Sequence, residues 1–347
     1  MNGLLLIALS AAYLLVLFFI AQWAEKRNVL SWKKTGPFIY ALSIAVYCSA
    51  WTFYGSIGRA ATSGIDFIAI YLGPVLVFPL WWIVVRKITR IVRVQHITSI
   101  ADFLAARYGK NQQIGTLVAL LTLVAVTPYI ALQIKAIGDS FIVVTGGSAY
   151  SWLDPVLVTT IAICAFTLIY GTRFLTGNKP KNGMVTAVAL ESLVKLGAFL
   201  IGGIVLISYV FGGSKKVFAE AMQRPELQEL FTLNSVSESQ DWLWLIVISG
   251  FAIVLLPRQF QVSAIENQDE RHLKKAMWMV PLYLLLINIF VLPIALAGRM
   301  YLPESSPSDY YFLNLASAYG GNWLTALIYF GGFSAATSMM VVSSLSL

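Results

Sequence analysis

Apolar runs separated by short polar segments make up most of the chain, and nine of them approach the roughly 20 residues that a helix needs to cross a bilayer. These runs cover residues 4–23, 38–57, 67–85, 113–144, 155–171, 185–211, 242–256, 276–297 and 322–347. The pattern therefore predicts nine membrane-spanning helices. The run at 4–23 has no basic start and no small-residue cleavage site, so we interpret it as an uncleaved anchor and not as a signal peptide.

The run at 38–57 changes character halfway along. Its apolar first half gives way at Cys48 to small and hydroxyl-bearing residues that continue to Ser56. Lipid offers no hydrogen-bond partner to these hydroxyl groups, so this helix is expected to face protein or a cavity. Two interpretations remain open: a helix that opens its backbone carbonyls toward a ligand, or a tight helix–helix contact that favours small residues.

The last run carries a comparable polar stripe. Ser334, Thr337 and Ser338 lie at positions i, i+3 and i+4 and share one helix face. Such hydroxyl groups commonly bond the backbone of their own helix. Together with the carbonyls of an opened helix at 38–57, they could instead supply oxygen ligands to a small hard cation such as Na⁺.

The composition is typical of a membrane protein, since 58% of the 347 residues are hydrophobic, 12% are charged and the mean hydropathy is +0.76. The net charge of +8 would suggest acidic partners in a soluble protein, but here the basic residues gather in loops. Most of the 24 Lys and Arg residues fall in loops on one side of the predicted bundle. Because basic loops face the cytoplasm, we predict an N-terminus on the outside.

Glu191 and Lys195 lie inside a predicted span, where the burial of charge makes ionisable residues candidates for function. They are separated by one helical turn, so they can pair on one face. We expect a structural ion pair near the cytoplasmic mouth, and a role as a proton relay is the alternative.

A second pair at the same spacing, Lys135 and Asp139, lies near the outer end of the run at 113–144. Tyr129 and Gln133 precede Lys135 at helical spacing and give this helix one polar face. We therefore expect the helix to line a cavity.

Motifs for catalysis or metal binding are absent from the sequence. Cys48 and Cys164 both fall in apolar runs, and His96 and His272 lie far apart in basic loops. The chain has no Gly-rich phosphate loop and no nucleophile–base motif. We therefore predict no catalytic residue on this chain, no metal other than sodium, and no nucleic-acid partner.

Two loops have helical character of their own. Residues 98–109 are predicted to form a short amphipathic helix on the cytoplasmic side, with Thr98 or Ser99 as its cap and Asp102 in its first turn. The polar loop at 212–241 is predicted to lie outside and to contain a surface helix.

The loop at 98–109 also carries a family resemblance. Residues 97–109, ITSIADFLAARYG, resemble the T-x-x-E-F-L-x-x-R-Y-G signature of the solute/sodium symporter family. The pattern Tyr129-x3-Gln133, the pattern Gly183-x3-Ala187-Val188 and residues 335–338 fit the same family. A finer similarity, carried by residues 47–56, 73–74, 128–133 and 256–261, is to the transporter-like sensor module of bacterial histidine kinases of the CbrA type.

The resemblance implies the LeuT fold, an all-α polytopic membrane protein in which inverted five-helix repeats surround a site at the membrane midplane. On that template the single domain at 1–347 has an extra N-terminal helix at 3–23, a first repeat at 38–211 and an incomplete second repeat at 242–347. The chain ends inside an apolar run, which we interpret as the end of a fragment of a longer protein.

The resemblance also implies a sodium site. Its ligands would be the backbone carbonyls of Ala45, Cys48 and Ser334 and the hydroxyl groups of Thr337 and Ser338. The residues that we expect to line the solute cavity are Ser49, Trp51, Tyr54, Tyr129 and Gln133. The proline-symporter branch of the family has an Asp important for sodium coupling where this chain has Tyr47.

The implied function is sodium-coupled transport of a small organic solute, an amino acid or similar nutrient, by alternating access across a bacterial inner membrane. The expected partners are Na⁺ as the coupling ion, the small-molecule solute and the lipid bilayer, with no other cofactor. The finer resemblance implies an alternative, which is the nutrient-sensing input domain of a membrane-bound sensor histidine kinase with fused or partner cytoplasmic kinase domains.

Overall fold

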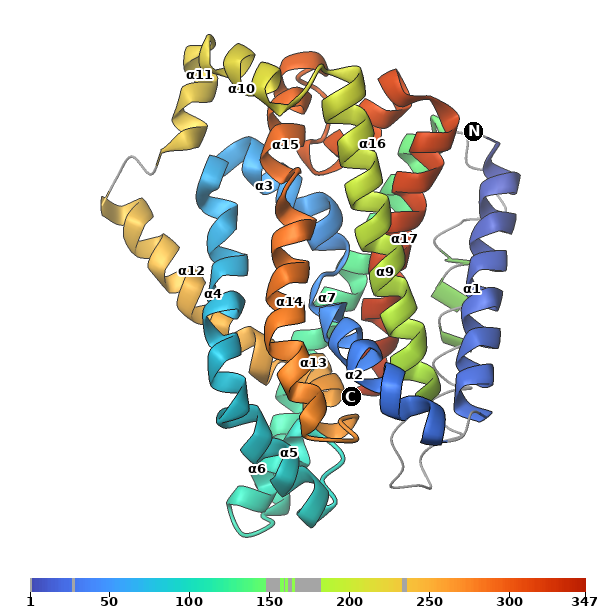
Figure 1. Ribbon diagram of the computed structural model, residues 1–347, viewed down its shortest axis with the longest axis vertical. Coiled ribbons are helices and arrows are strands. Elements are labelled where there is room, and N and C mark those ends of the chain that lie inside the picture. The colour runs from blue at the N-terminus through green and yellow to red at the C-terminus, as the bar shows by residue number, and fades with distance from the viewer. Residues whose placement is uncertain are drawn as a thin grey trace.

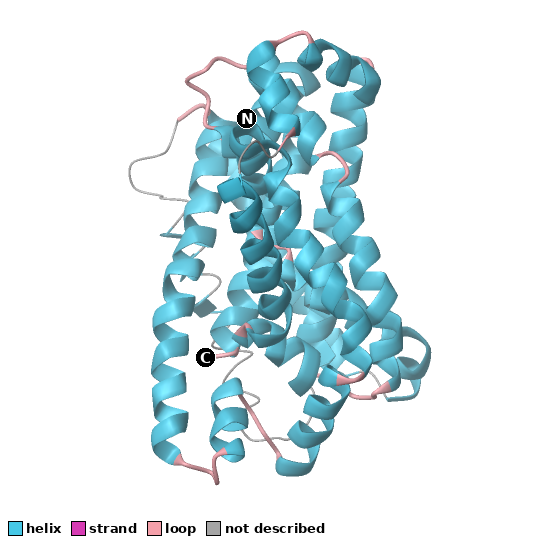
Figure 2. Cartoon of the chain, turned by 90° about the vertical axis from the view of Figure 1, so that its left-hand side faces the viewer, coloured by secondary structure: helices cyan, strands magenta, loops and turns pink. Residues whose placement is uncertain are grey.

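The computed structural model describes residues 2–26, 29–147, 157–158, 160–161, 164–165, 182–232 and 236–347, and every regular element in these ranges is a helix. The α-helices are α1 (Gly3–Lys26), α2 (Val29–Ile44), α3 (Ser56–Ser63), α4 (Ala69–Val77), α5 (Val84–Gln95), α6 (Ile100–Arg107), α7 (Gln112–Thr145), α9 (Asn182–Ile204), α10 (Ser214–Met222), α11 (Pro225–Gln228), α12 (Val236–Leu255), α13 (Pro257–Phe260), α14 (Arg271–Asn288), α15 (Val291–Tyr301), α16 (Tyr311–Leu315) and α17 (Gly321–Leu345). Short 3-10 or π-helical segments join them, namely η1 (Ala45–Tyr47), η2 (Trp51–Gly55), η3 (Gly64–Ile68), η4 (Phe78–Trp82), η5 (Val205–Val210), η6 (Glu229–Phe231), η7 (Gln261–Ile265), η8 (Ser308–Tyr310) and η9 (Ala316–Gly320). Figures 1 and 2 show the resulting helical bundle from two sides.

Six helical stretches among the described residues are long and apolar enough to cross a membrane, and one bent pair of helices makes up to seven. They are Gly3–Lys26, Trp51–Trp82, Gln112–Thr145, Asn182–Val210, Arg271–Tyr301 and Ser308–Leu345, with the bent pair Gln240–Leu255 and Pro257–Ile265. The predicted run at 38–57 is divided between a shorter apolar helix, Thr35–Tyr47, and the stretch that follows it. The predicted run at 155–171 falls almost wholly outside the described residues. The assignment of repeats at 38–211 and 242–347 stays a prediction.

The two ends of the bundle carry different segments. In Figure 1, α5 and α6 lie at the lower end, whereas α10, α11 and the N-terminus lie at the upper end. The predicted placement of 98–109 and 212–241 at opposite ends is therefore confirmed, and the second of these loops contains the expected surface helices. Which end faces the cytoplasm stays a prediction from the loop charges.

Helix α6 begins with the cap that the sequence predicts. The Ser99 Oγ accepts a hydrogen bond from the Asp102 backbone N–H at 3.1 Å, and the Asp102 carboxylate accepts one from the Thr98 hydroxyl at 2.7 Å. This reciprocal arrangement satisfies free donors at the helix start. The ring of Phe103 packs 5.4 Å from the ring of Phe260, measured between centroids, so α6 lies against α13 at this end of the bundle.

Helices α4 and α12 cross in backbone contact. A Cβ atom at Gly73 would lie 2.1 Å from the Ile246 carbonyl oxygen and 2.7 Å from the Gly250 nitrogen, so only glycine permits this approach. The Ser249 hydroxyl also donates a hydrogen bond to the Ala69 carbonyl oxygen at 3.2 Å. Small residues therefore bring these two helices together, as they do at many interfaces between membrane helices.

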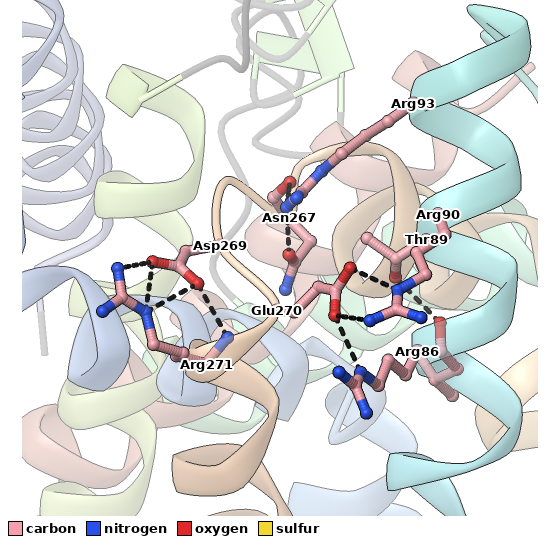
Figure 3. Close-up of polar contacts among 9 residues, drawn as sticks. Arg86, Thr89, Arg90, Arg93, Asn267, Asp269, Glu270 and Arg271 are labelled. Carbon is pink, nitrogen blue, oxygen red and sulfur yellow. Dashed lines mark hydrogen bonds and ion pairs between the residues drawn. The ribbon is translucent and has the colours of Figure 1, made fainter.

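A polar clamp, formed by Arg86, Arg90, Arg93, Asn267 and Glu270, joins α5 to the segment before α14 (Figure 3). The Glu270 carboxylate accepts hydrogen bonds from Arg90 Nε at 2.6 Å and from Arg86 Nε at 2.7 Å. The Arg93 Nη2 donates to Asn267 Oδ1 at 2.7 Å. The hydrogen bonds from Arg90 and Arg86 lower the pKa of the Glu270 carboxyl to about 2, so this group is a carboxylate at neutral pH.

Candidate functional site

The first core helix is interrupted where the sequence turns polar. Helix α2 passes into the 3-10 segment η1, and Cys48 then adopts an extended backbone, with φ −77° and ψ 96°. The π-helical segment η2 begins three residues later, at Trp51. An extended residue within a helix releases backbone carbonyls from the regular hydrogen-bond ladder. Of the two interpretations left open for the run at 38–57, the structure shows the opened backbone.

A second helix is interrupted at Leu256. This residue is extended, with φ −60° and ψ 134°, between α12 and α13, and the helix axis bends there by 48°. Pro257 lacks a backbone N–H and therefore suits the first position of the new helix. The chain then continues into the π-helical segment η7.

A cavity of about 240 Å³ lies between the two interruptions. Its lining combines aromatic and apolar side chains with one charged group. The lining residues are Tyr47, Trp51, Thr52, Ile70, Ala125, Val126, Tyr129, Ala252, Leu256, Pro257 and Arg258. Segments η1, η2, α4, α7, α12 and α13 thus meet around one space.

Four of the five predicted cavity residues lie at this space or directly behind it. Trp51 and Tyr129 line the cavity. The Ser49 and Tyr129 hydroxyl groups are hydrogen-bonded at 2.9 Å, and the Gln133 Oε1 accepts a hydrogen bond from the Ala50 backbone N–H at 3.0 Å. The polar face of α7 therefore braces the interruption in the first core helix.

Tyr54, the fifth predicted residue, lies elsewhere. Its side chain is buried against α17, where a Cβ atom at Gly332 would lie 2.1 Å from the tyrosine hydroxyl oxygen. That hydroxyl group donates a hydrogen bond to the Ile328 carbonyl oxygen at 3.4 Å. Tyr54 therefore packs the first core helix onto the last one and does not line the cavity.

Arg258 is the functional candidate that the sequence reasoning missed. The apolar run predicted at 242–256 ends two residues before it, so the sequence pattern places Arg258 in a loop, but its side chain is 6% exposed and lines the cavity. The physical reason is the bend at Leu256, which keeps α13 inside the bundle after the apolar run has ended. The guanidinium carbon lies 4.5 Å from the centroid of the Tyr129 ring, in cation–π contact.

The Lys195 ammonium group binds two backbone carbonyls at the interruption in the first core helix. Its Nζ donates hydrogen bonds to the Cys48 carbonyl oxygen at 2.7 Å and to the Ala45 carbonyl oxygen at 2.9 Å. The lysine side chain is fully buried. Among the ion pairs within 4.0 Å in the described part of the chain, none joins Lys195 to Glu191, so the expected ion pair between them is not formed.

The three hydroxyl groups of α17 also have partners within the protein. The Thr337 hydroxyl donates to the Glu191 carboxylate at 2.5 Å and approaches the Phe333 carbonyl oxygen of its own helix at 3.0 Å. The Ser338 hydroxyl donates to the Ala335 carbonyl oxygen at 3.2 Å, and the Ser334 hydroxyl donates to the Glu191 backbone oxygen at 3.0 Å. The Ser338 bond and the Thr337 contact with Phe333 match the alternative in which such hydroxyl groups bond the backbone of their own helix, whereas the other two bonds join α17 to Glu191 on α9.

The residues expected to hold sodium come together around Lys195 and Glu191, but their oxygens do not form a free ligand set. The Ala45 and Cys48 carbonyls accept hydrogen bonds from an ammonium group, whose positive charge would repel a sodium ion at the same oxygens. Tyr47, at the position of the Asp in the proline-symporter branch, donates its hydroxyl to the Ile70 carbonyl oxygen at 3.2 Å. The arrangement therefore does not fit a sodium ion at these carbonyls.

The predicted pair of Lys135 and Asp139 on α7 is formed. The Asp139 carboxylate also accepts a hydrogen bond from the Tyr310 hydroxyl at 3.0 Å. This pair therefore links α7 to the η8 segment that precedes the last core helix.

Comparison with known proteins finds similarity to symporters. The model of the Sodium:solute symporter family matches residues 29–347. The uncharacterized symporter YhjB of Bacillus subtilis (strain 168) is 22% identical over 322 residues, which cover 89% of this chain and 62% of YhjB. The uncharacterized symporter YodF of the same organism is 23% identical over 335 residues, which cover 92% of this chain and 64% of YodF. The chain thus spans less than two thirds of the length of these relatives.

The fold resembles that of a solved transporter. The substrate-bound, outward-open structure of a Na⁺-coupled sialic acid symporter aligns with a TM-score of 0.67 and 19% sequence identity, over 98% of this chain and 73% of that one. The all-α transporter fold expected from the sequence is therefore confirmed. The family expected from the loop at 97–109 is confirmed as well, while the finer similarity to sensor kinases stays a prediction.

Proposed function

Because the chain belongs to the sodium:solute symporter family, we propose that it carries a small organic solute across a cell membrane by alternating access. The proposal includes an amino acid or a similar nutrient as the solute. It also includes a bacterial inner membrane as the location, with the N-terminus outside. The symporters named above support the transport class, and they give the sensor-kinase alternative no support.

The observation that carries the proposal is the meeting of two interrupted helices at one cavity. The break at Cys48 and the break at Leu256 border the same space of about 240 Å³. Interrupted helices within a membrane are tolerated where they line a cavity or protein, and in transporters they form the binding site. A cavity of this size suits a solute smaller than a typical drug molecule.

Sodium is the coupling ion of the family, and coupling to a cation gradient is part of the proposal. No step of the proposal uses a sodium ion at the carbonyls of Ala45 and Cys48, because the Lys195 ammonium group holds both of them. What this chain's own residues do is shape the cavity. Trp51 and Tyr129 provide its aromatic walls, and Gln133 keeps the interrupted helix in place.

Uptake into proteoliposomes tests the proposal. The full chain is reconstituted, and radiolabelled amino acids and small carboxylic acids are offered under an imposed sodium or proton gradient. We expect saturable uptake of at least one solute above that of empty liposomes. Trp51→Ala should abolish this uptake because it removes a cavity wall.

The matched control is Trp244→Ala on α12, since the Trp244 side chain is 65% exposed on the outside of the bundle. This variant should transport as the wild type does. Equal loss in both variants, or binding of a solute without uptake, would contradict the transport proposal.

A further inference from the structure

The solute cavity contains a buried positive charge without a counter-charge. Arg258 lines the cavity, its side chain is 6% exposed, and its Nε is buried without a hydrogen-bond partner. No carboxylate among the described residues lies within 4.0 Å of its guanidinium group. Its guanidinium group contacts the face of the Tyr129 ring.

A lone buried guanidinium group is energetically unfavourable. Arginine stays protonated in proteins, so Arg258 cannot escape the penalty by losing its charge. Removing an unpaired ion from water is strongly unfavourable, and a cation–π contact offsets this cost only in part. The Lys195 ammonium group adds a second buried positive charge near the interruption in the first core helix. The region therefore attracts an anion.

The geometry of the cavity favours a particular anion. A guanidinium group presents a planar fork of N–H donors that matches the two oxygens of a carboxylate. The Tyr129 hydroxyl is held by Ser49, which fixes the ring beneath the guanidinium group. The remaining walls at Trp51, Ile70 and Ala252 are aromatic or apolar and suit an uncharged remainder of the solute.

We propose that the solute carries a carboxylate and that Arg258 binds it inside the cavity. This inference rests on the proposed transport function and specifies its substrate class as a small organic carboxylate. Arg258 is then the residue that selects acids against their neutral analogues, because a neutral group leaves the guanidinium group unpaired.

Binding of matched acids and amides tests the inference without any transport. The full chain in detergent is titrated with propionate, pyruvate, L-proline and L-alanine and with the amide of each, and tryptophan fluorescence is recorded because Trp51 lines the cavity. At least one acid should bind, and its amide should bind at least about tenfold more weakly, as expected for the loss of a buried charge pair.

Substitutions of Arg258 test whether this residue causes the preference for acids over amides. Arg258→Gln should weaken binding of the acid at least about tenfold, whereas Arg258→Lys, which keeps a charge without the fork, should weaken it less. Arg93→Gln in the polar clamp is the matched control and should bind as the wild type does. The inference is overturned if no acid binds, if an amide binds as tightly as its acid, or if Arg258→Gln leaves the affinity within about twofold. A chain that binds acids but does not transport them contradicts only the proposed transport function.

A separate pair of contacts carries a second inference. The Lys195 Nζ lies within hydrogen-bond distance of both carbonyls that the family resemblance assigns to sodium. An ammonium group and a sodium ion are both compact monovalent cations, and they need the same oxygen lone pairs. We infer that Lys195 is the resident cation at Ala45 and Cys48, so that this chain does not bind sodium there.

The inference predicts a gain of sodium sensitivity when the amine is removed. Thermal unfolding of the full chain is measured in NaCl and in choline chloride of equal ionic strength. Lys195→Met and Lys195→Gln should show a sodium-specific stabilisation that exceeds that of the wild type, because the ammonium group no longer occupies the Ala45 and Cys48 carbonyls. Lys135→Met, which removes an exposed lysine on α7, should respond as the wild type does.

A second measurement does not depend on the folding of the Lys195 variants. In the wild-type background, Thr337→Ala and Ser338→Ala should leave the sodium response of thermal unfolding unchanged. A sodium response that these two substitutions weaken, or Lys195 variants that respond no more strongly than the wild type, would overturn the inference. Neither result depends on whether the chain transports a solute.

Discussion

Lys195 and Arg258 are both long basic side chains buried beside an interrupted helix, but the protein treats their charges differently. The Lys195 ammonium group has two carbonyl partners from the first core helix. The Arg258 guanidinium group lines an open cavity and has no carboxylate partner among the described residues. A charge that the chain itself satisfies contributes to folding, whereas a charge that it leaves unpaired lowers stability and is available to a ligand.

The largest effect is expected from Lys195→Leu. The substitution leaves the Cys48 carbonyl buried without its Lys195 donor, while the Ala45 carbonyl keeps only the backbone N–H of Cys48, and it should lower the free energy of unfolding by about 3 kcal/mol. The measurement is the melting temperature in detergent, followed by far-ultraviolet circular dichroism. Lys135→Leu, on the exposed side of α7, serves as the control and should change little. Equal melting temperatures for Lys195→Leu and the wild type would contradict the view that Lys195, unlike Arg258, stabilises the fold.

Arg258→Leu should change the free energy of unfolding in the opposite direction to Lys195→Leu. Without a bound solute, the substitution replaces an unpaired buried charge by an apolar side chain and should raise the free energy of unfolding by roughly 1–2 kcal/mol. The same melting experiment measures this gain. A lower melting temperature would show that Arg258 is bound within the fold and would contradict the view that its charge is kept for a ligand.

Gln133→Leu tests whether the charge of Lys195 and Arg258 matters, because Gln133 is a buried polar side chain without a charge. Its side-chain oxygen receives the Ala50 N–H, but its Nε2 is buried without a partner. The substitution removes the hydrogen bond to Ala50, which lowers stability, and it also removes the unsatisfied Nε2, which raises stability. The free energy of unfolding should therefore fall by only about 1 kcal/mol. Gln113→Leu at the exposed start of α7 is the control. A loss as large as that of Lys195→Leu would indicate that charge is not what distinguishes these sites.

The smallest effect is expected at the polar clamp, where solvent screens the charges. The folded-state pKa of Glu270 is lowered to about 2, so the clamp stabilises the protein at pH values above the ordinary glutamate pKa. This contribution should disappear as the pH falls through the folded-state value. The melting difference between the wild type and Glu270→Gln should therefore shrink on acidification and in high salt. A difference that grows toward low pH would contradict this assignment.

Predictions that rest on local chemistry were confirmed by the structure. Ser99 and Asp102 cap α6 because the signals for a helix start lie within a few residues of each other. The change of residue type at Cys48 marked the opened backbone for the same reason. The partner of Lys195 was missed because a sequence displays neighbours at i+4, such as Glu191, while its actual partners lie about 150 residues away.

Arg258 shows a second limit of sequence reasoning. It follows the end of an apolar run and a proline, which are the usual signs that a span has ended. Only the bend of 48° at Leu256 returns the next segment to the bundle interior. The chemical type of the residue could be read from the sequence, but its position in the cavity depends on tertiary packing.

The backbone contact at Gly73 has a mechanical consequence. Helices that touch through their main chains have no soft side-chain layer between them, so α4 and α12 are expected to move as a single rigid body. Ile70 on α4 and Ala252 on α12 both line the cavity, so the wall that these two helices form is expected to keep its shape. A change in cavity shape during a transport cycle must then come from movement of the opposite wall. That wall includes Tyr129 on α7, so α7 is expected to slide relative to α4 and α12.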